Sequence, residues 1–146
     1  MIALVALGSN LGDRSAHLEA GLEALRELGS VMPSPLVVET PDESGRGPAY
    51  LNTVVRLDAR LEDPCRLLEA LLRAELRLGR DRSQGRNAPR SLDLDLIEVD
   101  GQQGRWAWPT PEDLRILGPE LTLELPHPRA HLRVFVQEPM RVLPRA

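Results

Sequence analysis

Residues 91–99 read Ser-Leu-Asp-Leu-Asp-Leu-Ile-Glu-Val and form the clearest strand pattern in the chain. Alternate side chains of a strand share one face. The leucines are therefore expected to point into the core, while Asp93 and Asp95 point together in the other direction. The sequence predicts a strand over residues 92–99 that is apolar on one face and acidic on the other.

The segments around this strand alternate between strand and helix patterns. Asp63-Pro64 is a typical helix start, with Asp as the N-cap, and Gly29 is placed to end the first helix. Prolines at 33 and 35 favour an edge strand. The predicted strands cover residues 2–8, 31–39, 50–61, 92–99 and 121–125, and the predicted helices follow residue 12, begin at Asp63, and lie at 112–117 and 131–142 with an interruption at Pro139.

The order strand, helix, strand, strand, helix, strand resembles the split βαβ, ferredoxin-like arrangement. We therefore expect an α+β fold in which an antiparallel sheet carries helices packed on one face. The sequence shows no internal repeat, low-complexity segment or dividing linker. Residues 1–146 are accordingly expected to form a single domain.

The composition excludes several classes of protein. The 146 residues are 42% hydrophobic and 27% charged, and no apolar run approaches the roughly 20 residues that span a bilayer. A net charge of -4 and 3% aromatic residues argue against a nucleic-acid partner. Cys65 is the only cysteine, which favours a reducing, cytoplasmic setting. There is no lysine, so any phosphate must be held by arginines or backbone amides.

Two neighbouring features point to phosphate chemistry. Asp93 and Asp95 repel each other unless a cation lies between them, and hard oxygen ligands suit Mg²⁺ when substrate phosphates complete its shell. Four arginines precede them within eleven residues, at positions 80, 82, 86 and 90. Each feature alone has a simpler interpretation, a solvated acidic face and a basic loop that offsets nearby acids. Together they favour a phosphoryl or pyrophosphoryl transfer site.

Four sequence blocks resemble the 6-hydroxymethyl-7,8-dihydropterin pyrophosphokinase family of folate biosynthesis. They are ALGSNLGDR near the start, PAYLNTVV at 48–55, GRDRSQGRNAPRSLDLDLIEVDG at 79–101 and LPHPRAHLRVFVQEP at 125–139. The resemblance covers nearly the whole chain. It implies transfer of the β,γ-pyrophosphate of ATP to the hydroxymethyl group of the pterin, which leaves AMP.

The resemblance also implies a role for individual residues. Asp93 and Asp95 match a pair that binds two Mg²⁺ ions, and Arg80 and Arg90 match arginines that steady the phosphates. Positions that match the nucleotide site are Glu75, Arg82, Arg90, His127 and Arg133. Positions that match the pterin pocket are Thr40, Pro41, Tyr50, Asn52 and Phe135. The expected partners are ATP and the pterin alone, without nucleic acid or membrane, and the chain is expected to be a monomer.

Alternatives remain at this point. Ferredoxin-like domains also serve as regulatory or RNA-binding modules, because a fold does not determine a function. A relative that binds pterin without turnover is a third reading. Asn87 stands where many family members have tryptophan, and residues 102–118 look like an insertion whose role the sequence does not show.

Overall fold

The computed structural model describes residues 1–10, 12–41, 49–78 and 92–144. Its main sheet is antiparallel throughout. Four of its strands are, in spatial order, β2 (Gly29–Pro33), β4 (Tyr50–Ala59), β1 (Ile2–Ser9) and β5 (Asp93–Val99). A further short strand, β3 (Val38–Thr40), also pairs with β4. The strand that carries the two aspartates therefore lies at one edge, and β2, which ends at Pro33, lies at the other, as predicted.

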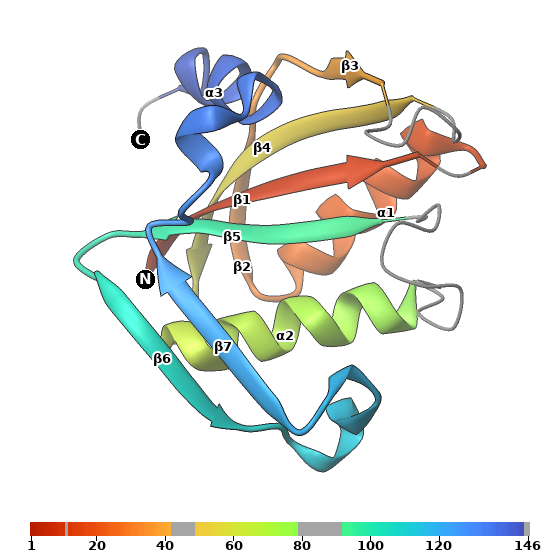
Figure 1. Ribbon diagram of the computed structural model, residues 1–146. Coiled ribbons are helices and arrows are strands. Elements are labelled where there is room, and N and C mark those ends of the chain that lie inside the picture. Colours follow the sequence, from red (N-terminus) through yellow and green to blue (C-terminus); the bar gives the residue numbers. More distant parts are fainter. Residues whose placement is uncertain (11, 42–48, 79–91, 145–146) are drawn as a thin grey trace.

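Two helices, α1 (Arg14–Arg26) and α2 (Pro64–Arg77), cover one face of this sheet (Figure 1). Together with the order of the strands, they confirm the predicted α+β, split βαβ architecture. The larger core lies between these helices and the sheet. It includes Val5, Leu25, Leu71 and Leu96.

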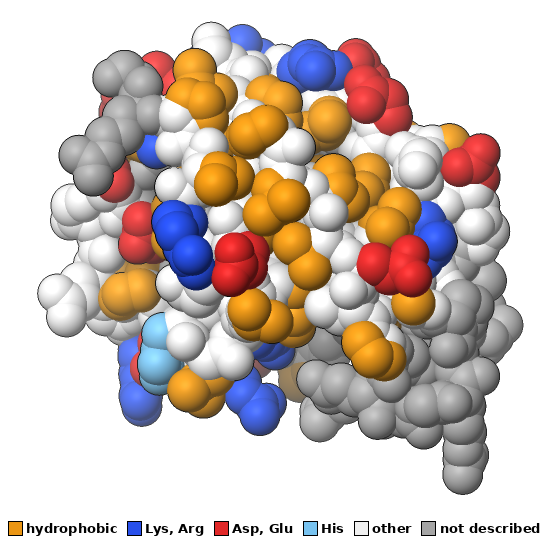
Figure 2. Space-filling model, turned by 90° about the horizontal axis from the view of Figure 1, so that it is seen from above, with side chains coloured by type: hydrophobic (Ala, Val, Ile, Leu, Met, Phe, Trp, Pro, Cys, Tyr) orange, Lys and Arg blue, Asp and Glu red, His pale blue; other side chains and the backbone are white. Residues whose placement is uncertain are grey.

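The opposite face of the sheet is covered in part by the C-terminal addition, a 3-10 helix, η3 (Ala130–Leu132), followed by α3 (Val134–Arg141). A second, smaller core lies beneath it and includes Val54 and Val136. Figure 2 looks down on this side of the molecule and shows apolar side chains distributed among charged ones. The predicted helix over residues 131–142 is thus two helical pieces, and Pro139 lies inside the second.

Local sequence explains where the two long helices begin. The Asp13 carboxylate accepts a hydrogen bond from the Ala16 backbone N–H at 3.0 Å, and the Asp63 carboxylate accepts one from the Cys65 N–H at 2.8 Å. Side-chain oxygens at these positions satisfy backbone donors that the first turn leaves unpaired. The predicted start of α2 at Asp63-Pro64 is confirmed.

The prediction that Gly29 ends α1 is wrong. The helix ends at Arg26, and Gly29 is the first residue of β2. A Cβ atom at this position would lie 1.9 Å from the carbonyl oxygen of Asp58 on the paired strand β4. Glycine is therefore present because two backbones approach closely, rather than to cap the helix.

The segment predicted as one extended strand over residues 31–39 is divided in the structure. β2 ends at Pro33 and β3 begins at Val38, and both pair with β4. Between them, the Ser34 hydroxyl donates a hydrogen bond of 2.8 Å to the carbonyl of Pro139. The predicted strand from residue 50 to 61 ends at Ala59.

Residues 104–125 form an excursion from the main sheet. It consists of β6 (Gly104–Pro109), the 3-10 helix η2 (Glu112–Leu117) and β7 (Glu120–Leu125), with β6 and β7 paired in a separate two-stranded sheet. The short helix at 112–117 is confirmed, whereas β6 was not predicted. Figure 1 shows the excursion alongside α2.

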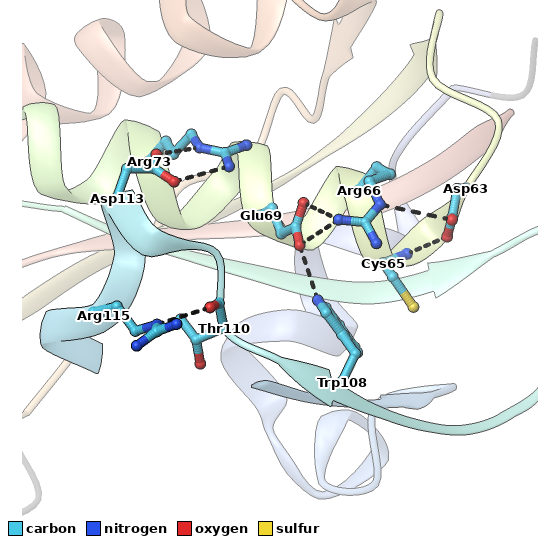
Figure 3. Close-up of polar contacts among 9 residues, drawn as sticks. All are labelled: Asp63, Cys65, Arg66, Glu69, Arg73, Trp108, Thr110, Asp113 and Arg115. Carbon is cyan, nitrogen blue, oxygen red and sulfur yellow. Dashed lines mark hydrogen bonds and ion pairs between the residues drawn. The ribbon is translucent and has the colours of Figure 1, made fainter. Parts of the chain in front are cut away.

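Side-chain contacts hold the excursion to α2 (Figure 3). The Trp108 indole N–H donates to the Glu69 carboxylate at 2.8 Å, and Arg66 donates to the same carboxylate at 2.6 Å. Farther along the helix, Arg73 forms two hydrogen bonds with Asp113, at 2.6 and 3.2 Å. We call these five residues the α2 cluster. No helix among the described residues is long and apolar enough to cross a membrane.

Candidate active site

Strand β5 has two different faces, and a β-bulge lies at Ile97, just past the two aspartates. Leu4 of β1 pairs with Glu98, but Val5 pairs with Leu96, so Ile97 is an extra residue. Leu94 and Leu96 enter the core beneath the helices, whereas Ile97 enters the core beneath α3. The two aspartates alternate with the leucines and share the α3 face with Ile97, as the sequence pattern predicts.

The α3 face of the sheet brings polar groups from three strands into one row. Gly8 on β1 pairs with Asn52 on β4 and with Asp93 on β5. Directly opposite residues in an antiparallel sheet project to the same side. Asn52 and Asp93 therefore flank a glycine that places no side chain between them. The next row holds Asp95, opposite Ala6.

The amide of Asn52 is fixed by its neighbours. Its Nδ2 donates hydrogen bonds to the carbonyl of Val38 at 3.1 Å and to the Thr40 hydroxyl at 3.0 Å. Both donors are occupied, so the amide oxygen is left as the acceptor. A Cβ atom at Gly8 would lie 3.2 Å from that oxygen and 3.6 Å from the ring of Tyr50. Glycine therefore keeps open the space beside both groups.

The two aspartates lie where a cation can reach them. Both are half-buried, and the side chain of Asp95 is 47% exposed. The Arg133 guanidinium lies 3.6 Å from the Asp95 carboxylate and 5.8 Å from the centre of the Phe135 ring. Two carboxylates on one face of a strand suit a hard cation such as Mg²⁺, which prefers oxygen ligands.

His127 is held by backbone contacts on both sides. The backbone N–H of His127 donates to the carbonyl of Ile97 at 2.7 Å, and the ring Nδ1 accepts a hydrogen bond from the backbone N–H of Arg129 at 3.1 Å. The neutral ring therefore carries its proton on Nε2, which is available to donate. Burial lowers the pKa of His127, the Asp95 charge partly offsets this, and the nearby Arg133 charge adds to it.

Glu75 approaches β5 from the α2 side, unlike Asp93, Asp95 and Asn52, which lie on the α3 face. It is buried, with 3% of its surface exposed, and its carboxylate accepts a hydrogen bond from the Leu94 N–H at 3.0 Å. Leu94 lies between the two aspartates in the sequence. The carboxylate thus binds the backbone of the acidic strand from beneath.

The structure brings most of the predicted site residues together. Asp93, Asp95 and Asn52 share one face of the sheet, and Thr40 pairs with Tyr50 at the start of β4. The remaining described candidates are Pro41, which follows β3, Phe135, which packs on the smaller core, and His127 and Arg133, which lie close to Asp95. The predictions for Arg80, Arg82 and Arg90 lie outside the described residues. Gly8 was overlooked as a site residue, although it lies within the first family-like block.

Comparisons with known proteins identify the family of this chain. The family model of the 7,8-dihydro-6-hydroxymethylpterin-pyrophosphokinases matches residues 4–144. The 2-amino-4-hydroxy-6-hydroxymethyldihydropteridine pyrophosphokinase of Mycobacterium leprae is 36% identical over 136 residues, which cover 93% of this chain and 68% of the relative. The enzyme of the same name from Pseudomonas aeruginosa is 34% identical over 143 residues, with coverage of 93% and 76%.

A solved structure shares the fold. It is a crystal structure of an HPPK-DHPS in complex with substrates, and it superposes with a TM-score of 0.70 at 12% identity. The superposition covers 92% of this chain and 38% of that chain. With the family match over nearly all of the sequence, the chain belongs to the 7,8-dihydro-6-hydroxymethylpterin-pyrophosphokinase family and is a pyrophosphokinase of folate biosynthesis.

Proposed function

We propose that residues 1–146 form one catalytic domain that transfers the β,γ-pyrophosphate of ATP to the hydroxymethyl oxygen of 6-hydroxymethyl-7,8-dihydropterin. AMP is the second product. The observation that carries this proposal is the row of Asn52, Gly8 and Asp93 across three strands. A flat ring bound beside Asn52 directs a substituent across the glycine toward the acidic strand, where the phosphates are bound.

The end of the site formed around Asn52 binds the flat, amide-like ring of the pterin. The Asn52 oxygen accepts an N–H of the ring, since the two hydrogen bonds from Nδ2 fix its orientation. Tyr50 and Phe135 supply aromatic surface for the ring faces. Thr40 and Pro41 form the rim at the end of β3.

The phosphate end of the site combines carboxylates with cationic and N–H donors. Asp93 and Asp95 hold Mg²⁺, with two ions expected, and bound magnesium neutralises phosphate charge during transfer. His127 donates from Nε2 to a phosphate oxygen, and Arg133 supplies a guanidinium beside Asp95. The predicted contributions of Arg80, Arg82 and Arg90 complete the set. Phosphoryl chemistry depends mainly on positioning and charge, so the proposal needs no dedicated general base.

The proposal extends to the setting of the enzyme. The net charge of -4 and the single, buried Cys65 support a cytoplasmic protein whose partners are its two small substrates, without nucleic acid or membrane. We propose that it acts as a monomer. Light scattering at assay concentration tests this, and a dimer mass would contradict it.

The decisive experiment measures AMP release from MgATP with and without 6-hydroxymethyl-7,8-dihydropterin. Release is expected only when the pterin is present, and EDTA should abolish it. A pterin analogue without the hydroxyl is the matched control and should bind without producing AMP. AMP release independent of the pterin, or full activity in EDTA, would contradict the proposal.

A further inference from the structure

The acidic strand β5 is an edge strand, so part of its backbone lacks a hydrogen-bonding partner within the sheet. One side of β5 pairs with β1, and no strand pairs with its other side among the described residues. Edge N–H groups have no ladder partner and leave the strand free to shift or twist. On β5 such movement would carry Asp93 and Asp95 with it.

Glu75 meets one of these edge groups. The Leu94 N–H donates to its carboxylate rather than to β1, at 3.0 Å. The peptide between the two aspartates is therefore held by helix α2. The contact is buried, because Glu75 is 3% exposed and Leu94 is also 3% exposed.

Burying the carboxylate of Glu75 beneath the sheet carries a free-energy cost of desolvation. Transfer of a charged group from water into a protein interior is unfavourable unless hydrogen bonds compensate. The other buried glutamate of α2, Glu69, accepts hydrogen bonds from two side chains, Trp108 and Arg66. The Glu75 carboxylate accepts a hydrogen bond from the main chain of the strand that bears both aspartates, 19 residues away in the sequence.

We infer that Glu75 is a positioning residue, which fixes the β5 peptide between Asp93 and Asp95 and so sets the direction of the two carboxylates. This inference rests on the proposed function of the two aspartates. It differs from the nucleotide contact that the family resemblance implies for Glu75. The role depends on the acceptor oxygen and not on the negative charge.

Two substitutions separate these possibilities. Glu75→Gln keeps an acceptor oxygen of the same reach and removes the charge, whereas Glu75→Met keeps the volume and removes the acceptor. Glu69→Met is the matched control, because it removes the other buried carboxylate of the same helix. The three variants are compared with the wild type for Mn²⁺ affinity in the presence of a non-hydrolysable ATP analogue, by electron paramagnetic resonance.

We expect Glu75→Met to weaken Mn²⁺ binding and to lower kcat by about 10- to 100-fold, the usual effect of removing a group that orients metal ligands. The KM for the pterin should change little, because Asn52 lies on β4. Glu75→Gln should recover most of the kcat and Mn²⁺ affinity that Glu75→Met loses, and Glu69→Met should retain wild-type values. If Glu75→Gln is as impaired as Glu75→Met, the charge is what matters and the positioning role is wrong.

Amide hydrogen exchange provides a readout that does not depend on activity. In the wild type, the Leu94 amide should exchange as slowly as amides paired within the sheet. It should remain protected in Glu75→Gln and lose protection in Glu75→Met. Rapid exchange of Leu94 in the wild type would overturn the inference. Absence of pterin-dependent AMP release would refute the proposed function. The exchange of the Leu94 amide would still show whether Glu75 holds the β5 backbone.

Discussion

The hydrogen bonds of Glu69 in the α2 cluster and the ion pair between Arg133 and Asp95 differ in length. In the α2 cluster, Glu69 accepts hydrogen bonds from Arg66 and Trp108 at 2.6 and 2.8 Å, and Arg73 donates two to Asp113 at 2.6 and 3.2 Å (Figure 3). On the other face of the sheet, Arg133 remains 3.6 Å from Asp95, beyond hydrogen-bond distance, and the Asp95 side chain is half exposed.

We infer from this difference that Glu69 holds the fold, whereas Asp95 and Arg133 are the groups proposed to bind a ligand. The buried carboxylate of Glu69 has its hydrogen-bonding capacity directed inward, so its removal lowers stability. A longer ion pair at an exposed carboxylate can exchange one cation for another at small expense. Similar residue types therefore predict opposite consequences of substitution, and the following experiments test that contrast.

The largest expected effect comes from Asp95→Ala. Removing this carboxylate should lower pterin-dependent AMP release by roughly 10³-fold, because the charge that organises the phosphates is lost. Asp113→Ala removes the same charge from the α2 cluster and should retain wild-type turnover. Both rates are normalised to folded protein by circular dichroism. Equal losses in the two variants would remove the distinction between the clusters.

The second test asks for the opposite result, a loss of stability without a loss of turnover. Glu69→Met should lower the free energy of unfolding by about 1–3 kcal/mol, because it leaves the Trp108 indole N–H without its acceptor. Urea denaturation measures this loss. Turnover per folded molecule should be unchanged. A fall in kcat without a change in the denaturation midpoint would place Glu69 in the active site instead.

The third test concerns the space beside Asn52. Gly8→Ala places a methyl group 3.2 Å from the Asn52 oxygen, and we expect the KM for the pterin to rise by about 5- to 10-fold, equivalent to about 1 kcal/mol. The KM for ATP should change less. Gly21→Ala, which crowds Leu7 and Leu92 on the helix side, is the control and should leave both KM values unchanged. A pterin KM unaffected by Gly8→Ala would show that the ring binds elsewhere.

The sequence predicts the acidic strand well because its pattern is local. A period of two places Asp93 and Asp95 on one face whatever the rest of the chain does. The start of α2 is similarly local, since Asp63 caps the helix that Pro64 begins. These features needed only neighbouring residues.

Features that depend on distant contacts were missed or misread. Gly29 resembles a helix terminator, but the carbonyl of Asp58 on the paired strand determines its place. The contact between Glu75 and the Leu94 backbone joins residues 19 positions apart, and no spacing rule reports it. β6 was not predicted, although Trp106 and Trp108 alternate along it. None of its residues is fully buried, so it lacks the strong apolar alternation of a core strand.

The smallest expected effect is the pH dependence of the exposed pair in the α2 cluster. The hydrogen bond from Arg73 holds the pKa of Asp113 below its usual value of about 3.9. A carboxyl group with a lowered folded-state pKa stabilises the fold at pH values above its unfolded pKa, and this contribution disappears as the pH falls through the folded value. The melting temperature of the wild type should therefore exceed that of Asp113→Ala slightly at pH 7, and the two should converge as the pH falls below about 4. High salt should also reduce the difference, because the pair is exposed. A difference that persisted at low pH would mean that Asp113 stabilises η2 by packing rather than by charge.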